Sequence, residues 1–172
     1  MKRIVAAVAL SMAVACGWCR EAADFAGHYV WSTNAAEAQA LAQEVDAAIA
    51  GLNFMIRPVG RPRLTKSAAP YQTIDITVSN AAIRFARAGA PAIDSKLNGE
   101  PVKWQREECA VYDVAFAMTP DGQLQQTFSE ADGVRTNLFT LATDGQGMTM
   151  HVTICSKRLK HALDYRLTYI KR

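Results

Sequence analysis

Residues Pro120–Gly145, PDGQLQQTFSEADGVRTNLFTLATDG, carry the strongest indication of the fold. Asp121-Gly122, Asp132-Gly133 and Asp144-Gly145 recur at spacings of 11 and 12 residues. Asp-Gly tolerates positive φ at the tip of a β-hairpin, and this interval suits consecutive strands joined by tight turns. Pro120 presets the backbone angle of the first turn. The stretch therefore predicts antiparallel strands that run up and down.

The same two-residue period extends over most of the chain after Tyr71. Apolar and polar residues alternate at Ile74–Val78, Ile83–Phe85, Val102–Trp104, Tyr112–Phe116, Leu124–Phe128, Met148–Ile154 and Leu163–Tyr169. One apolar and one polar face per strand is typical of antiparallel sheets, and Asn98-Gly99 adds a turn signal. Eight or nine short strands must close or pack to hide their edges. The expected fold is mainly β (α+β): an antiparallel up-and-down meander forming a closed or nearly closed barrel, with an open sheet curved around a helix as the alternative.

A helix is predicted directly after the first strand. Phe25–Ser32 is rich in aromatic and β-branched residues and predicts that strand. Thr33 or Asn34 can cap a helix, with Glu37 in its first turn. The apolar residues that then share one helical face are Leu41, Val45, Ile49 and Leu52.

Regular structure is expected to end soon after this helix. Phe54–Ile56 is a second apolar cluster, and Gly60 and Pro62 are expected to break regular structure beyond it. We therefore expect a single domain over residues 25–172, with a helical insert at about residues 35–57.

The N-terminal residues 1–15 predict a cleavable signal peptide. Lys2 and Arg3 precede an uncharged apolar run, Ile4–Ala15. This run is shorter than the roughly 20 residues that a membrane-spanning helix needs. Cleavage after Ala15 leaves Cys16 as the first residue of a linker over residues 16–24. The expected location is the periplasm or outer envelope of a bacterium.

Cys16 leaves two forms of the exported protein open. Ala13-Val14-Ala15-Cys16 resembles a bacterial lipobox, in which the cysteine receives lipid after cleavage. The lipobox pattern prefers Leu three residues before the cysteine, where this chain has Ala13. The protein is therefore expected either free and soluble, or tethered to a membrane through a lipidated Cys16.

The four cysteines fit an oxidising compartment. Cys109 and Cys155 lie in strand-like segments and are the expected structural disulfide. Cys16-Gly17-Trp18-Cys19 has the CxxC spacing but lies at the signal junction, whereas a redox motif opens a helix after a strand. Redox catalysis is therefore not expected.

No catalytic constellation, metal site or cofactor motif is identified. The three histidines, His28, His151 and His161, do not show metal-ligand spacing. The chain contains no Gly-x-Ser-x-Gly elbow and no phosphate-binding glycine loop. A net charge of +3 is too small to indicate a nucleic-acid partner.

Two groups of residues are candidates for ligand binding. Arg57, Arg61 and Arg63, with Lys66, form either a cationic rim for an anionic ligand head or a charge complement to a helix C-terminus. The second group either lines a cavity or fills the core: Trp104, Tyr112, Phe116, Phe128, Met148 and Met150.

A first strand carrying Gly27 and Trp31, then a helix, then a run of hairpins resembles the calycin barrels, the lipocalins and fatty-acid-binding proteins. The helix between the first two strands is similar to the helical lid of the fatty-acid-binding group. That group places an Arg and a Tyr two residues apart on its last strand, whereas Arg166 and Tyr169 are three apart and should face opposite sides. The resemblance implies a lipocalin-like barrel with a small apolar or amphipathic ligand.

Two functions follow from these patterns, and an enzyme on the same scaffold is a third alternative that they leave open. The first is an exported, non-enzymatic protein that binds a hydrophobic or amphipathic small molecule. The alternative is an envelope interaction or structural module whose core is filled by side chains. The oligomeric state and the ligand are not indicated by the sequence.

Overall fold

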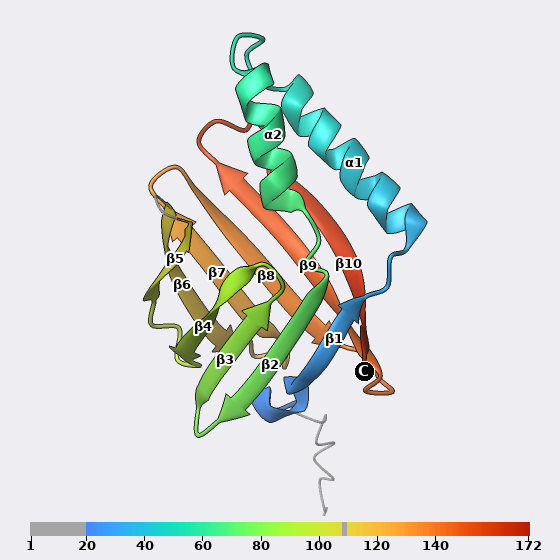
Figure 1. Cartoon of the computed structure of the whole chain (residues 1–172), viewed down its shortest axis with the longest axis vertical. Coiled ribbons are helices and arrows are strands. Elements are labelled where there is room, and N and C mark those ends of the chain that lie inside the picture. Colours follow the sequence, from blue (N-terminus) through green and yellow to red (C-terminus); the bar gives the residue numbers. More distant parts are fainter. Residues whose placement is uncertain (1–19, 108–109) are drawn as a thin grey trace, which may run out of the picture.

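The computed structural model describes residues 20–107 and 110–172. Within them, ten antiparallel strands curl into a nearly closed barrel, and two α-helices stand over one end (Figure 1). A 3₁₀ turn, η1 (Ala22–Phe25), precedes the barrel. The helices are α1 (Ala35–Ala50) and α2 (Arg57–Ala68). The strands are β1 (Gly27–Trp31), β2 (Thr73–Ser79), β3 (Ala82–Arg87), β4 (Ala90–Lys96), β5 (Val102–Glu107), β6 (Ala110–Met118), β7 (Leu124–Glu130), β8 (Gly133–Leu141), β9 (Gly147–Ser156) and β10 (Leu163–Lys171).

The strand order confirms the predicted meander. Neighbours run β4-β3-β2-β1-β10-β9-β8-β7-β6-β5, so each pair of sequential strands forms a hairpin except at the two helices and between β4 and β5. The first strand of the chain pairs with the last, and the curled sheet brings its two edge strands, β4 and β5, together. Ten strands form where eight or nine were expected. The alternating segments omitted β4 and β8, although the Asp132-Gly133 and Asp144-Gly145 turns bracket β8.

The glycine turns behave in two ways. Gly122 and Gly145 have positive φ, 72° and 70°, as the Asp-Gly pattern predicts. Gly133 instead begins β8, and a Cβ there would lie 2.6 Å from the carbonyl oxygen of Cys155. Gly99 also has positive φ, but it joins β4 to β5, which are not neighbours in the sheet. The Asn98-Gly99 turn is therefore not a hairpin tip.

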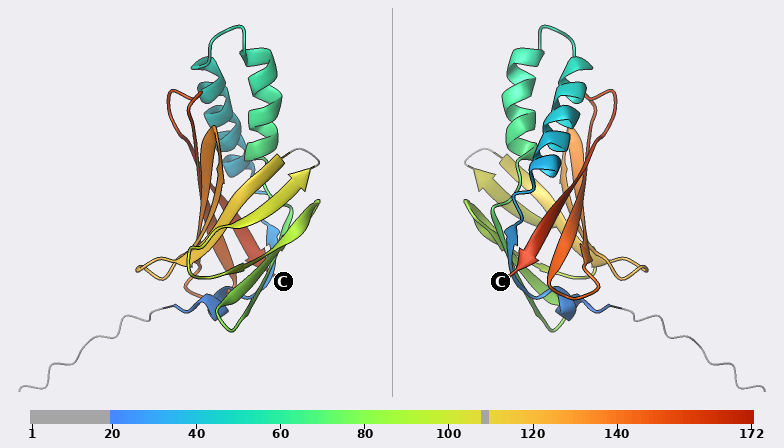
Figure 2. Two further views of the ribbon diagram at one scale, coloured as in Figure 1. Left: turned by 90° about the vertical axis from the view of Figure 1, so that its left-hand side faces the viewer. Right: turned by 90° about the vertical axis from the view of Figure 1, so that its right-hand side faces the viewer.

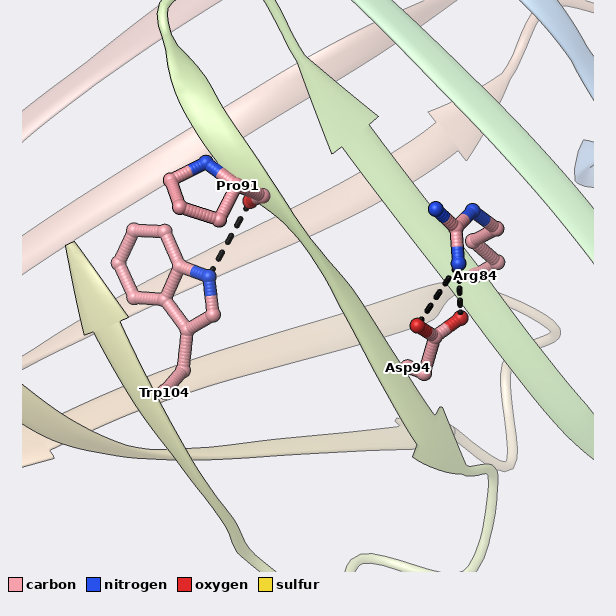
Figure 3. A network of polar contacts seen from close by, with 4 residues as sticks. All are labelled: Arg84, Pro91, Asp94 and Trp104. Atoms are coloured by element: carbon pink, nitrogen blue, oxygen red, sulfur yellow. Dashed lines mark hydrogen bonds and ion pairs between the residues drawn. The ribbon is translucent and has the colours of Figure 1, made fainter.

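A side chain bridges the seam where β4 and β5 meet. The indole Nε1 of Trp104 on β5 donates to the carbonyl oxygen of Pro91 on β4 at 3.2 Å (Figure 3). By contrast, the paired strands β3 and β4 carry the ion pair of Arg84 with Asp94, at 2.8 Å, in addition to their ladder. The seam thus replaces a backbone ladder with a side-chain contact.

Helix α1 covers the edge of β10 that β1 leaves free. The side chain of Asn34 accepts a hydrogen bond from Ala36 N at 2.9 Å, which confirms one of the two predicted caps. β1 ends at Trp31, and beyond its pairing with β10 the backbone N–H of Thr168 donates to the Glu37 carboxylate at 2.9 Å. The apolar face of the helix is buried at Leu41, Val45 and Ile49.

Helix α2 corrects the expectation that Gly60 and Pro62 break regular structure, because both lie inside it. Pro58 occupies the first turn, where no intrahelical N–H donor is needed. Pro62 lies inside the helix and has no backbone N–H, so one intrahelical hydrogen bond is missing there. Contacts with the barrel compensate at the other end of the helix, since Tyr165 Oη donates to the Ala68 carbonyl at 2.8 Å. The helical insert therefore extends to Ala68, beyond residue 57.

The barrel interior away from the helices is filled by side chains. Phe25, Phe85, Phe116 and Phe139 are fully buried there, with tilted ring contacts of 5.7 and 5.8 Å around Phe85. No helix among the described residues is long and apolar enough to cross a membrane. The predicted signal peptide at residues 1–15, together with Cys16 and Cys109, lies outside the described residues.

We predict that Trp104→Phe weakens the seam. The substitution keeps an aromatic ring but removes the hydrogen bond to Pro91, and should destabilise the protein by about 1–3 kcal/mol in urea unfolding. Hydrogen exchange of β4 amides should accelerate at the same time. Asp94→Asn, which disrupts only the exposed ion pair with Arg84, is the control and should cost less than about 0.5 kcal/mol. Equal effects of the two variants would show that Trp104 has no special role in the seam.

Candidate ligand-binding site

Polar side chains replace apolar ones inside the barrel near the helices. On β8, Arg135 and Asn137 lie on the same face as buried Phe139. Gln126 on β7 is fully buried beside them, and Asn137 Nδ2 donates to its Oε1 at 2.8 Å. On β3, Arg87 follows the inward-facing Ile83 and Phe85 at the same two-residue spacing. The interior thus changes from aromatic to cationic toward the helical end.

Arg87 and Arg135 border a hollow of about 100 Å³ under the end of α2. Its walls come from both sides of the barrel, the segment before β2 and the end of α2. Aromatic and cationic side chains dominate the lining: Tyr71, Arg87, Trp104, Tyr112, Phe128 and Arg135. The carbonyl of Ser67 at the end of α2 accepts a hydrogen bond from Arg135 Nη1, so the same arginine holds the helix over the hollow.

Two guanidinium groups enclose one aromatic ring. The Cζ of Arg87 lies 4.5 Å from the ring centre of Tyr71, and that of Arg135 lies 5.0 Å from the same centre. Arg87 also lies 5.5 Å from the ring of Trp104. Such cation–π contacts hold the cations without neutralising them. Burial is the main cause that lowers the pKa of Arg87, which nevertheless stays charged at neutral pH.

Several buried donors at the hollow are unsatisfied by the described residues. They are Nε of Arg87, Nη2 of Arg135 and, deeper, Nε2 of Gln126. The Nε of Arg135 is occupied, because it donates to Asn137 Oδ1 at 2.8 Å. A buried donor without an acceptor costs about 1–3 kcal/mol, and more when it is charged. The arrangement is therefore suited to an acceptor that carries negative charge.

Two further spaces adjoin the hollow. One, of about 110 Å³, shares Ser67, Tyr71, Arg87 and Arg135 with it. The other is a groove of about 530 Å³ that runs between α2, the β7–β8 turn and the β9–β10 loop. The residues common to the hollow and the groove are Ser67, Glu130, Ile154 and Ser156. The groove is mostly apolar, with Leu52, Ile56, Val59, Leu64 and Leu159 in its walls.

The aromatic and methionine candidates separate into two sets. Trp104, Tyr112 and Phe128 line the hollow and contact one another, with ring centres 5.8–6.3 Å apart. Phe116, Met148 and Met150 are at most 1% exposed and belong to the core. Only the first set borders the described spaces.

The three candidate arginines of α2 also lie in different places. Arg57 donates to the carbonyls of Leu52 and Ala50 at 3.0 and 2.7 Å, at the end of α1. Arg61 pairs with Asp46 of α1 at 2.6 Å. Arg63 lines the groove. The first two join α1 to α2, and the third is available to the groove.

Sequence reasoning missed the central residues of the hollow, Tyr71, Arg87 and Arg135. The sequence does carry an indication of Arg87, because it follows Ile83 and Phe85 at the same two-residue spacing and is therefore expected to face the barrel interior. An arginine at an apolar position of a strand is rarely buried without a partner. Tyr71 precedes β2 and shows no period, so only the fold places it.

The remaining candidates do not form a second site. Cys155 on β9 is exposed and has no disulfide with any described residue, and its expected partner Cys109 is not among them. No group of three or more His, Cys, Asp or Glu side chains within residues 20–107 and 110–172 could hold a metal ion. Tyr169 faces the core while Arg166 is exposed, so these two residues face opposite sides as predicted.

The architecture is similar to that of the calycin-type barrels: an antiparallel meander, nearly closed, with a helical insert after its first strand. No family model matches the chain, and no curated protein matches it. The likeness is visible in solved structures.

Three solved structures illustrate that likeness. A secretary abundant heat soluble (SAHS) protein from Ramazzottius varieornatus superposes with a TM-score of 0.58 at 10% identity, covering 87% of this chain and 96% of its own. Apo lipid binding protein 8 from Caenorhabditis elegans gives 0.53 at 14% identity, covering 89% and 99%. A Schistosoma mansoni fatty acid binding protein in complex with arachidonic acid gives 0.51 at 13% identity, covering 87% and 96%. At these identities the likeness establishes the fold alone.

We predict that alkaline pH destabilises the protein through its buried tyrosines. Burial raises the pKa of Tyr165 to about 12, from 10.0 when unfolded, although Arg135 lowers it in part. Burial raises the pKa of Tyr169 as well. The folded state favours the neutral phenol, so this stability is present below pH 10 and is lost as the pH rises toward 12. Tyr165 alone should account for a loss of about 2 kcal/mol by pH 12, measured by urea unfolding at several pH values.

Tyr165→Phe provides the control for this effect. The variant should be about 1 kcal/mol less stable at pH 7, because it lacks the hydrogen bond to the Ala68 carbonyl. Its stability should fall less steeply than that of the native chain above pH 10. Parallel curves for the two proteins would contradict the assignment to Tyr165.

Proposed function

We propose that the protein is an exported, non-enzymatic binding protein for an amphipathic anion, a molecule with a small negative head and an apolar tail. The observation that carries this proposal is the pair of partly buried guanidinium groups, Arg87 and Arg135, whose unpaired N–H donors border an aromatic hollow. The proposal covers either form of the exported chain, soluble or tethered through Cys16.

A carboxylate suits the hollow in size and charge. The described lining contains three cations, Arg87, Arg106 and Arg135, and one acid, Glu130. Guanidinium groups bind carboxylates through parallel N–H···O bonds that are stronger than neutral ones. A space of about 100 Å³ holds a carboxylate but is well below the 300–1,000 Å³ typical of whole-ligand pockets. The rest of the ligand must therefore lie elsewhere.

The groove under α2 supplies that space. Its volume of about 530 Å³ falls within the usual range for small-molecule sites. The groove and the hollow share four wall residues and so adjoin each other, which places a ligand tail in the groove when its head lies in the hollow. Burial of an alkyl chain there contributes about 0.8 kcal/mol per methylene. The ligand expected is a chain with one acidic head.

The structural neighbours support the proposal at the level of chemistry. Two of the three are by name a lipid binding protein and a fatty acid binding protein, the latter with arachidonic acid, itself an amphipathic carboxylate. The signal-peptide pattern at residues 1–15 supports export. Because the identities are low, the proposed anion site rests on this chain's own arginines.

A second function, an interaction module with a filled core, is favoured by two observations. The barrel away from the helices is packed with fully buried aromatic rings. Phe54 and Met55 in the loop between the helices are 75% and 73% exposed. A ligand-binding test therefore distinguishes the two functions.

We predict that the native chain binds palmitate at least about tenfold more tightly than hexadecanol, which has the same tail without the charge. Binding is measured by native mass spectrometry and by quenching of tryptophan fluorescence, since Trp104 lines the hollow. Arg87→Met should bring the two affinities close together. Arg166→Met, on the exposed outer face of β10, is the matched control and should leave the preference unchanged.

Three outcomes would contradict the proposal. Absence of binding for both probes would favour the interaction module. Equal binding of acid and alcohol by the native chain would remove the anion site. An unchanged preference in Arg87→Met would place the head away from the hollow.

A further inference from the structure

Exposed apolar side chains gather at the free end of the helical pair. Of the described large apolar residues with high exposure, four are consecutive or nearly so: Phe54 (75%), Met55 (73%), Ile56 (43%) and Val59 (58%). We call these four residues the tip. They occupy the connection between α1 and α2 and the first turn of α2. This connection lies at the end of the molecule opposite the C-terminus (Figure 1). The tip is therefore a protruding apolar surface.

The fold does not require this exposure. The buried contacts of the helical pair come from Leu41, Val45, Ile49 and Leu52, on α1 and directly after it. The side views show the helix connection rising above the barrel, with the β9–β10 loop reaching only the part of the helical pair below it (Figure 2). Clustered apolar exposure of this kind marks an interaction site rather than the normal scatter of apolar residues on a surface.

Positive charge surrounds the tip. α2 carries Arg57, Arg61, Arg63 and Lys66, and the chain has no acid between Asp46 and Asp75. The β9–β10 loop adds Lys157, Arg158 and Lys160. This loop reaches the base of the tip, since a Cβ at Gly51 would lie 3.8 Å from Cβ of Lys160.

Local acids neutralise only part of this charge. Asp46 pairs with Arg61 at 2.6 Å, and Asp132 pairs with Arg158 at 2.7 Å. Arg63 is exposed on α2 and borders the groove. The surface that faces outward around the tip is cationic, so its partner carries negative charge and accepts apolar side chains.

We propose that the tip docks on the surface of an anionic lipid bilayer. Phe54 and Met55 enter the boundary between headgroups and acyl chains, and the surrounding arginines and lysines contact lipid phosphates. The shape favours a bilayer over a folded protein partner, because a narrow convex tip can insert among lipids but offers little of the roughly 1,000 Å² or more that a stable protein interface needs.

Docking would also bring the ligand groove to the membrane. Three of the four tip residues, Met55, Ile56 and Val59, also line the groove. Arg63 lines the groove next to them. An amphipathic molecule could then pass between bilayer and groove without crossing water. Docking itself rests on the tip alone and holds whether or not the proposed ligand is bound.

The test is sedimentation of the purified chain with vesicles of phosphatidylcholine, with and without phosphatidylglycerol. The native chain should bind the anionic vesicles and bind the neutral ones weakly, and salt at about 0.5 M should reduce binding. The double variant Phe54→Ser, Met55→Ser should bind about tenfold more weakly. Arg63→Glu should bind at least about fivefold more weakly.

Matched controls lie at the other end of the molecule. Ile170→Ser replaces a 43% exposed apolar residue of β10, and Arg172→Glu reverses an exposed charge at the C-terminus. Both should bind like the native chain. All variants keep the same N-terminal segment, so any difference between them reports the substituted surface. Circular dichroism and urea unfolding confirm that each variant is folded.

A tryptophan introduced at the tip gives an independent readout. In Phe54→Trp, fluorescence should shift to shorter wavelength with anionic vesicles and be quenched by brominated acyl chains. The proposal is overturned if the native chain ignores anionic vesicles, if the tip variants bind like the controls, or if the introduced indole stays in water. Binding that depends on charge but not on Phe54 and Met55 would also overturn it and would point to an acidic protein or nucleic-acid partner. None of these outcomes depends on palmitate binding.

Discussion

The pairing of β1 with β10 is the constraint on which the rest of the structure depends. Tyr29, Val30 and Trp31 lie opposite Lys171, Ile170 and Tyr169, which joins the four strands β1–β4 to the six strands β5–β10 in one sheet. An open ten-stranded sheet would leave its whole apolar face and two long edges unprotected. The β1–β10 pairing leaves only β4 and β5 as edges, and the curled sheet brings them together, where the Trp104 indole supplies the contact that a ladder would otherwise provide.

The shortness of β1 explains the helical end. β1 ends at Trp31, so it pairs only with the last residues of β10 and leaves the first part of β10 without a strand on that side. α1 covers this part with its buried apolar face, and Glu37 accepts a hydrogen bond from the backbone of β10. α2 then returns the chain to β2 across the mouth of the barrel. Its last turn is held by Arg135 and Tyr165, whose polar ends reach the carbonyls of Ser67 and Ala68. The mouth is consequently polar where the opposite end is apolar.

This division of the interior has functional consequences. The interior away from the helices is filled by buried side chains, whereas the cationic region beneath the helices retains unpaired donors and a hollow next to an apolar groove. The two proposals use adjoining surfaces of the same end: the hollow and groove for a ligand, and the tip for a bilayer. Their proximity follows from one cause, the placement of α2 over the mouth.

Local patterns predicted much of the barrel. The Asp-Gly turns at Gly122 and Gly145, the alternation in β2, β6, β9 and β10, and the cap at Asn34 all depend on neighbouring residues, and the structure confirms them. β4 was missed because Ala90–Lys96 has few large apolar residues, so its alternation is weak. α2 was missed because Pro58, Gly60 and Pro62 disfavour a helix locally, whereas contacts with α1 and with the barrel hold it in place.

The residues of the hollow could not be found in this way, although their strand positions were readable. Alternation shows that a side chain faces inward, but it does not show which inward residues from distant strands meet. Arg87 and Arg135 belong to strands far apart in the sheet, and Tyr71 joins them only after closure. The strands, the turns and the helical insert can be predicted because each depends on residues that are close together in the sequence. The gathering of two arginines around one ring, next to a groove, depends on how the barrel closes, which is a property of long-range packing.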